Sequence, residues 1–252
     1  DQARRQHAEE HVSFPALWVA YVGFNLSRPP FNDLRVRQAF ALAVDRERFV
    51  NEVWEGLFTP ATGGLLPPGM PGHSPGIGLP FDPARARQLL AEAGYPEGHQ
   101  FPSVKGVGGH PREVENLQAQ WRENLGVEVE WDVLDVATAY ETLSRELPPL
   151  FWAAWSAEYP DPDALLRAVL QMPYHIWHDD TYDSLVEEAR RLTDQDERMK
   201  LYREADRILV EEVPLTPVMS LRQHLLVKPW VRTYPMSLLG DVFWKDVIIE
   251  PH

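Results

Sequence analysis

A serine flanked by glycines is the first candidate for covalent chemistry in this sequence. Residues 72–76 read GHSPG and match the G-x-S-x-G turn that carries the nucleophile of many serine hydrolases. In those enzymes the N–H after the serine forms half of the oxyanion hole, but here the next residue is Pro75, which has no N–H. The flanking glycines and prolines predict neither a preceding strand nor a following helix. The pattern therefore favours a plain loop over a hydrolase site.

Two groups of histidines and carboxylates have the spacing of metal ligands. Residues 7–11 (HAEEH) match H-x-x-E-H, in which two histidines one helical turn apart hold Zn²⁺ and the glutamate activates water. Only alanines give this segment an apolar face, so we expect a solvated polar lead-in instead. Residues 175–180 (HIWHDD) could ligate a divalent metal, but they also fit a loop before a helix. Without further ligands, the sequence predicts no metal and no cofactor.

Nucleotides and nucleic acids are poor candidates as ligands. Residues 106–109 (GVGG) lack the last glycine of the dinucleotide fingerprint, and Pro111 opens the next helix. The 24 Lys and Arg residues against 38 Asp and Glu residues give a net charge of -14, which repels phosphate backbones and anionic lipid headgroups. The absence of cysteine excludes thiol nucleophiles, thiolate zinc sites and iron–sulfur clusters. Cationic or zwitterionic ligands suit this charge better, although a negative surface also serves solubility.

Residues 153–166 (AAWSAEYPDPDALL) combine an aromatic residue with a carboxylate. A short strand delivers Trp155, and Glu158 and Tyr159 then emerge in a proline-flanked turn just ahead of a helix. An aromatic wall beside a carboxylate suits the recognition of a ligand cation. The alternative is that Trp155 belongs to the core and Glu158 is a solvated turn residue. This segment alone leaves both interpretations open.

Helices that alternate with short strands position these residues and place the chain in the α/β class. Aspartates at 33, 45, 82, 161 and 194 are typical N-caps, and residues 59–80 are rich in proline and glycine and predict a long surface loop. We expect strands over residues 17–24, 101–107, 127–133 and 150–155, further helices over residues 111–125, 137–147 and 182–192, and a strand-like, proline-broken end over residues 215–252.

Membrane insertion has no support in this sequence. The longest nearly apolar run, residues 14–24, is shorter than the about 20 residues that a membrane helix requires. The first residues are polar, so no signal peptide is expected in this chain.

Blocks along nearly the whole chain resemble one protein family. Residues 24–50, 61–73 (ATGGLLPPGMPGH), 81–98 (FDPARARQLLAEAGYPEG), 155–163 (WSAEYPDPD) and 201–218 follow each other as successive blocks do in that family. It is the dipeptide/oligopeptide-binding class (family 5) of the bacterial extracellular solute-binding proteins that feed ABC importers.

This resemblance implies a periplasmic-binding-protein-like (type II) lobe, a mixed sheet flanked by helices. Members are about twice as long and close two lobes around the ligand, and the chain is similar to their C-terminal half. Residues 1–16 are then a polar lead-in, residues 17–222 the second lobe, and residues 223–252 a return segment that belongs to the missing first lobe. Leu17 to Phe24 and Leu215 to Leu221 are the expected hinge crossings.

The resemblance also implies the ligand site. Peptide binders of the family pair an acidic residue of this block with the α-ammonium of the ligand, and the preceding strand pairs with the ligand backbone. Carried over by position, the anchor is Glu158, with Trp155, Ser156 and Ala157 along the strand edge and Tyr159 beside it. The family pattern usually has aspartate at this position, and glutamate is one methylene longer.

The expected function is therefore the substrate-binding component of an ABC importer, without enzymatic activity. Its partners are a small peptide or related solute, the membrane subunits of the importer and the missing N-terminal lobe, with no nucleic acid. The expected location is periplasmic or extracellular, associated with the membrane in the parent protein. An isolated lobe with an uncovered apolar surface is expected to self-associate. The alternatives are a solute-sensing domain of a regulatory protein and, with less support, a metal-dependent or serine hydrolase.

Overall fold

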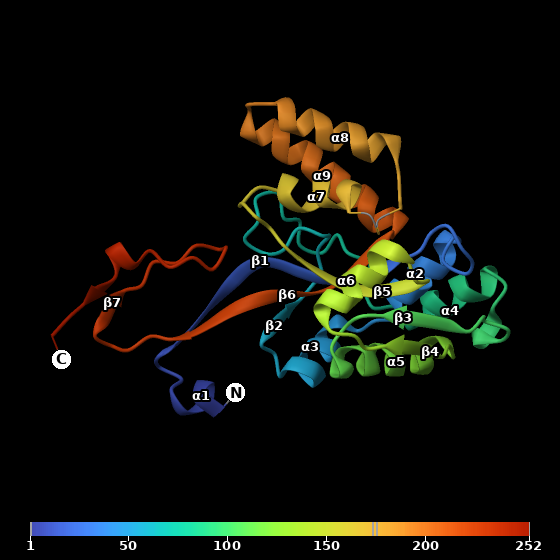
Figure 1. Ribbon diagram of the computed structural model, residues 1–252, viewed down its shortest axis with the longest axis horizontal. Helices are drawn as coiled ribbons and strands as arrows, with labels where there is room; N and C mark the ends of the chain where they lie inside the picture. Colours follow the sequence, from blue (N-terminus) through green and yellow to red (C-terminus); the bar gives the residue numbers. More distant parts are fainter. Residues whose placement is uncertain (1, 173, 175, 252) are drawn as a thin grey trace.

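A six-stranded mixed sheet forms the centre of the molecule (Figure 1). The structure is a computed structural model and describes residues 2–172, 174 and 176–251. The strands lie in the order β2-β6-β1-β5-β3-β4. Their bounds are β1 (His11–Phe24), β2 (Phe58–Pro60), β3 (Val104–Val107), β4 (Val129–Asp132), β5 (Leu150–Ser156) and β6 (Leu215–Leu226).

The pairing of β5 leaves part of one of its edges uncovered. On one side β5 runs antiparallel to β1, from Phe24 opposite Leu150 to Trp18 opposite Ser156. On the other side it runs parallel to β3, but only Leu150 and Phe151 pair with that strand. Because β3 ends at Val107, no described strand covers this side of β5 beyond Phe151.

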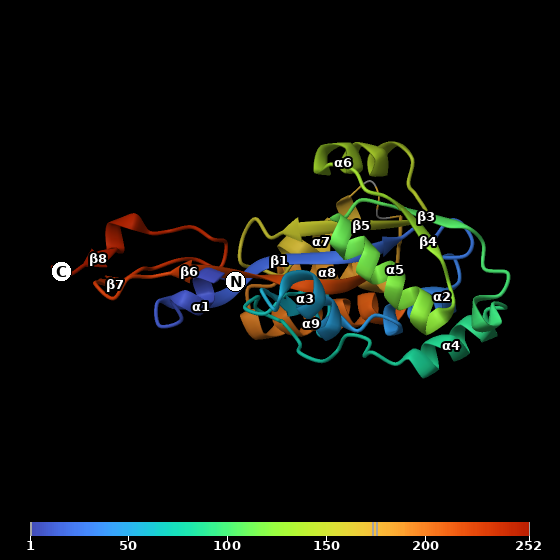
Figure 2. The same ribbon diagram turned by 90° about the horizontal axis from the view of Figure 1, so that it is seen from below.

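Helices cover both faces of the sheet (Figures 1 and 2). Side chains alternate along β1, so that Ala20 and Val22 pack on the α2–α5 side while Val19 and Tyr21 pack on the α7–α9 side. Burial on both faces explains why this strand reads as an apolar run. The helices are α1 (Gln2–Gln6), α2 (Leu34–Leu42), α3 (Arg46–Trp54), α4 (Pro83–Glu92), α5 (Pro111–Leu125), α6 (Val136–Arg145), α7 (Asp163–Gln171), α8 (Asp180–Arg191) and α9 (Gln195–Glu212).

Aspartate side chains begin most of these helices, as the sequence predicts. Asp33, Asp45, Asp82 and Asp194 are N-caps whose carboxylates accept a hydrogen bond from a backbone N–H in the first turn of α2, α3, α4 and α9. Helix α7 differs: Pro162 is its N-cap and makes no side-chain cap, while Asp161 accepts a hydrogen bond from the backbone N–H of Asp163.

The proline- and glycine-rich segment after β2 is held on the α9 side of the sheet. The backbone N–H of Leu65 donates to Oδ1 of Asp206, on α9, over 2.7 Å. A Cβ at Gly64 would lie 2.2 Å from the same oxygen, so the loop can approach the carboxylate this closely only with glycine there. The loop is thus ordered by a buried carboxylate.

Strand β1 begins earlier than the sequence predicts. It starts at His11 and not near Leu17, because residues 11–15 pair with Arg222 to Leu226 of β6. Strand β3 begins at Val104, after Pro102, which has no N–H to donate to a ladder. After β6 the chain forms a small antiparallel unit from β7 (Val231–Thr233), a 3₁₀ turn (Trp244–Asp246) and β8 (Ile248–Ile249), which extends away from the six-stranded sheet (Figure 1). The segment between β7 and the 3₁₀ turn comes back to the sheet, where the carbonyl of Leu238 accepts a hydrogen bond from the N–H of Leu17, on β1, over 3.0 Å.

Candidate functional site

The candidate site lies at the carboxyl ends of the parallel strands. Strands β3, β4 and β5 run parallel, so the residues that follow them meet at the same end of the sheet. Open α/β sheets bind their ligands at this carboxyl end of the strands. The turn that carries Glu158 and Tyr159 directly follows β5.

The backbone of β5 shows which residues can pair with a ligand. Pro149 accepts a hydrogen bond from the N–H of Asn25, and Ala157 donates its N–H to Leu17 over 2.8 Å, so these residues face β1. Residues at even positions face the other way. The carbonyl of Trp152 lies against Gly108, and that of Ala154 accepts a hydrogen bond from the Tyr140 hydroxyl.

Two positions of β5 therefore present their N–H and C=O groups at the uncovered edge. They are Ala154 and Ser156, and the side chain of Ser156 is exposed. Ala157, which the resemblance places along the edge, is buried and its N–H is already bonded to β1. Backbone pairing with a ligand thus falls to Ser156 and Ala154.

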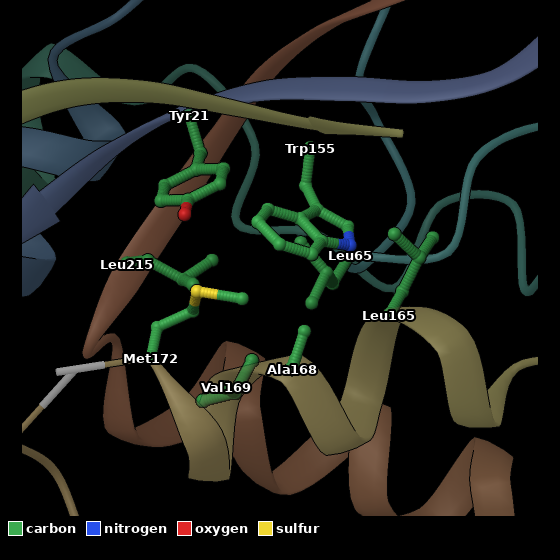
Figure 3. Close-up of a pocket in the computed structure, with 8 residues that line it drawn as sticks. All are labelled: Tyr21, Leu65, Trp155, Leu165, Ala168, Val169, Met172 and Leu215. Carbon is green, nitrogen blue, oxygen red and sulfur yellow. The ribbon is translucent and has the colours of Figure 1, made fainter. Parts of the chain in front are cut away.

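The Trp155 side chain lies on the α7 side of the sheet (Figure 3). It is half-buried and borders a cavity of about 10 Å³, which is close to the volume that one water needs. Its indole Nε1 is buried and has no hydrogen-bond partner within the described part of the chain. The cavity is otherwise lined by Tyr21, Leu65, Leu165, Ala168, Val169, Met172 and Leu215.

Tyr159 is bound within the turn itself. Its hydroxyl donates to Oδ2 of Asp163 over 2.7 Å and accepts a hydrogen bond from Arg167. Burial, followed by the hydrogen bond to the Asp163 carboxylate, raises the pKa of Tyr159. Asp163 also forms ion pairs with Arg167 and Arg190.

An arginine of α9 fixes the same turn. Asp161 accepts two hydrogen bonds from Arg198, one from each terminal nitrogen, over 2.9 and 3.1 Å. The Nε of Arg198 also donates to the carbonyl of Ala189, on α8, and its guanidinium lies 5.5 Å from the ring centre of Tyr202. A bidentate contact of this kind fixes both position and orientation.

Glu158 differs from its two acidic neighbours. It is exposed, and it makes no hydrogen bond or ion pair with any residue that the structure describes. Asp161 and Asp163 are neutralised by arginines, so Glu158 is the carboxylate of this turn that remains available to a cationic ligand group.

An apolar groove of about 530 Å³ borders the uncovered edge of β5. Its walls are the start of α5, helix α6 and the segment after β4, and Val136 of α6 is 74% exposed. Glu113 is one of its few charged groups, and burial raises the pKa of this carboxyl. Ligand sites combine apolar walls with a few placed polar groups in this way. The lining residues are Trp18, Gly109, His110, Pro111, Glu113, Val133, Leu134, Asp135, Val136, Ala139, Tyr140, Leu143, Trp152, Ala153 and Ala154.

Sequence reasoning missed this groove. His110 comes three residues after the segment expected as a strand over residues 101–107, and Val133 is the last residue of the segment expected as a strand over residues 127–133. The rule that parallel strands gather their carboxyl ends at one edge could have pointed to both residues. Nothing in the sequence indicated that Tyr140 contacts β5.

The other motifs do not assemble into sites. Ser74 lies in the loop, as expected, and its hydroxyl donates to the carbonyl of Gly72. His7 follows α1 and His11 begins β1, so these two histidines do not share a helix. His178 lies 3.0 Å from Asp180 and 2.7 Å from Asp183, whereas His175 is outside the described residues. Within the described ranges, no group of three or more His, Cys, Asp or Glu side chains could hold a metal ion.

Among the residues that the structure describes, no helix has both the length and the apolar character needed to cross a membrane.

The fold and its open edge define a class of protein. The chain is one lobe of a periplasmic-binding-protein-like (type II) fold, and HbpA2 from Haemophilus parasuis superimposes on it with a TM-score of 0.89 at 24% identity. That match covers 99% of this chain and 52% of HbpA2. A family model described as bacterial extracellular solute-binding proteins, family 5 middle, matches residues 1–173. The chain belongs to this family, which confirms the resemblance.

Curated relatives of the chain are named for different ligands. One is the "Probable deoxycholate-binding periplasmic protein YgiS" of Escherichia coli (strain K12), which is 33% identical over 94% of this chain and 46% of its own length. Another is di/tripeptide-binding protein 1 of Pseudomonas aeruginosa (strain UCBPP-PA14), 29% identical over 88% of this chain and 43% of its own length. The chain thus spans about half the length of the curated relatives it matches.

Proposed function

We propose that this chain is the second lobe of the substrate-binding component of an ABC importer, and that it binds short peptides or similar small solutes with a free amino group. One observation carries the proposal: the uncovered edge of β5, at Ala154 and Ser156, leads directly to Glu158, an exposed carboxylate without a partner among the described residues. The names of several relatives, which include di/tripeptide-binding proteins, support the choice of peptides.

The edge and the carboxylate have different roles in this mechanism. A ligand that adds a strand to β5 satisfies its backbone without using its side chains, which gives broad specificity. The ammonium–carboxylate pair with Glu158 then fixes the register of the ligand. The extra methylene of glutamate places the ammonium further from the strand than an aspartate would. The apolar groove beside the edge provides room for side chains.

The chain works together with a first lobe in this proposal. Residues 17–222 form the second lobe, β1 and β6 contain the hinge crossings, and residues 223–252 return to the first lobe. Trp244 is 71% exposed and Ile249 62%, and both lie in the small terminal unit apart from the sheet. We propose that the first lobe covers this surface and that the isolated chain self-associates through it, which sedimentation equilibrium would show as mass above the monomer.

The remaining partners follow from the same proposal. The importer's membrane subunits receive the closed protein in the periplasm or outside the cell, where the protein is held at the membrane. The ligand is released unchanged, because binding at a strand edge needs no reacting group. The loop position of Ser74 and the missing N–H of Pro75 support a binding role over hydrolysis.

Calorimetry on the full-length protein tests the proposal. A dialanine peptide and its N-acetylated form are titrated into wild type and Glu158→Gln. Losing one partner of a desolvated charge pair costs about 2–5 kcal/mol, so we expect Glu158→Gln to bind the free peptide at least about thirtyfold more weakly. The acetylated peptide lacks the ammonium, so its affinity is expected to be low and unchanged by the substitution.

Glu188→Gln is the matched control for this experiment. Glu188 is also an exposed glutamate, but it lies on α8, away from β5. Its substitution is expected to leave both affinities unchanged. Equal affinity of wild type and Glu158→Gln for the free peptide would contradict the proposed anchor.

A further inference from the structure

The uncovered edge of β5 is not fully open. Of the two residues that face it, Ala154 already has a partner, because the Tyr140 hydroxyl donates to its carbonyl over 2.8 Å. Tyr140 belongs to α6, which lies beside β5 in both views (Figures 1 and 2). The phenol thus occupies the place where a neighbouring strand would put an N–H. Ser156 remains exposed at the same edge.

The position of Glu158 determines which ligand residue reaches each of these groups. A ligand with its amino terminus at Glu158 runs antiparallel to β5, toward Ala154. Outward-facing groups of a strand recur at every second residue. Ser156 therefore meets the first or second residue of the ligand, and Ala154 meets the third or fourth.

We propose that Tyr140 determines ligand length: its hydroxyl closes the β5 edge at Ala154, so that the ligand backbone pairs at Ser156 alone and the site selects dipeptides and tripeptides over longer chains. This inference rests on the proposed function and names the ligand class of the same site. It makes Tyr140 a specificity-determining residue that does not contact the amino terminus of the ligand.

Packing holds the Tyr140 ring in this position. Ala139 and Leu143 of the same helix are buried. The Tyr140 ring is half-buried and lies 6.0 Å, centre to centre, from the ring of Tyr174. A longer ligand would have to break the hydrogen bond from Tyr140 to the Ala154 carbonyl and move the ring. Its third and fourth residues therefore add no binding free energy at this edge.

The test compares dialanine and tetra-alanine on the full-length protein by calorimetry. Wild type is expected to bind tetra-alanine no more tightly than dialanine. Tyr140→Phe keeps the ring but frees the Ala154 carbonyl, and one recovered hydrogen bond is expected to favour tetra-alanine over dialanine by about fivefold. Tyr140→Ala also removes the ring, so the preference for tetra-alanine is expected to be at least as large. Dialanine affinity is expected to stay unchanged in both variants.

Tyr182→Phe is the matched control. The Tyr182 hydroxyl also donates to a backbone carbonyl, that of Leu166, over 2.7 Å, but it does so in the core on the α7–α9 side. This substitution is expected to lower the melting temperature without changing the ratio of the two affinities. This control therefore distinguishes a general loss of stability from the change in the affinity ratio that is expected for the Tyr140 variants.

Two results would overturn the inference in distinguishable ways. If peptides bind and Glu158→Gln weakens them, but the ratio of the two affinities is the same in wild type, Tyr140→Phe and Tyr140→Ala, then Tyr140 does not control length and the proposed function stands. If wild type binds neither peptide, the proposed function fails and this inference fails with it.

Discussion

The three carboxylates of the turn after β5 differ in what surrounds them. Asp161 and Asp163 are paired with arginines, whereas Glu158 is exposed and has no partner among the described residues. The paired aspartates hold the turn, so that the unpaired glutamate is presented at the end of the strand. In the proposed complex, the ligand ammonium completes the charge pairing of this turn.

Arg198 is expected to hold this turn in place. Replacing it with lysine keeps the charge but removes the bidentate contact with Asp161 and the bond to the carbonyl of Ala189. We expect Arg198→Lys to destabilise the protein by about 1–3 kcal/mol, measured by urea unfolding. Peptide affinity is expected to fall as well, because the turn that carries Glu158 is released.

Arg203→Lys provides the control on the same helix. Arg203 is exposed and has no hydrogen bond or ion pair among the described residues. Its substitution is expected to leave both the free energy of unfolding and the affinity unchanged. If Arg198→Lys behaved like Arg203→Lys, the turn would be held by other contacts.

At the scale of elements, the sequence predicted where helices and strands form better than it predicted which distant segments they pair with. The apolar run of β1 and the aspartate caps of α2, α3, α4 and α9 are local signals, and the structure confirms them. The start of β1 at His11 depends on Arg222 to Leu226 of β6, which are distant in the chain. The hydrophobic periodicity of a segment does not indicate which distant segment it pairs with.

The same limit applies to the candidate site. The segment with Trp155, Ser156 and Glu158 could be selected from residue types and from the family resemblance. Which of these residues face the open edge depends on the pairing of β5 with β1, and Tyr140 reaches Ala154 from a separate helix. Likewise, the pairing of Asp161 with Arg198, 37 residues away, is a tertiary contact.

The contact between α9 and the loop after β2 makes stability depend on pH. Asp206 is fully buried, and burial raises its pKa to about 6 from the ordinary value of 3.8. The folded state therefore holds this proton more tightly than the unfolded state does. Its contribution to stability is full below about pH 4 and is lost as the pH rises through about 6.

Asp206→Asn is expected to remove this dependence. Between pH 4 and pH 7 the contribution of Asp206 changes by about 2 kcal/mol, so the free energy of unfolding of wild type relative to Asp206→Asn should fall by that amount as the pH rises. Urea unfolding of both proteins at several pH values measures it. A difference that is constant across this range would show that the carboxyl does not titrate as inferred.

At the scale of the whole molecule, the sheet is covered on both faces, but one side of β5 is uncovered beyond Phe151. This uncovered edge lies beside Ser156, Glu158 and the apolar groove next to α6. The small terminal unit, which extends away from the sheet, carries further exposed apolar residues. The chain also spans about half the length of its curated relatives. These features support the proposal that the chain is one lobe whose surfaces face a second lobe and a ligand.

A crystal structure of the full-length protein with a bound dipeptide tests the central claim most directly. We predict that the ligand ammonium lies within hydrogen-bond distance of the Glu158 carboxylate, that the ligand backbone pairs with Ser156, and that a first lobe covers the groove. A dipeptide bound elsewhere, with Glu158 still in solvent, would contradict the claim that this edge of β5 is the ligand site.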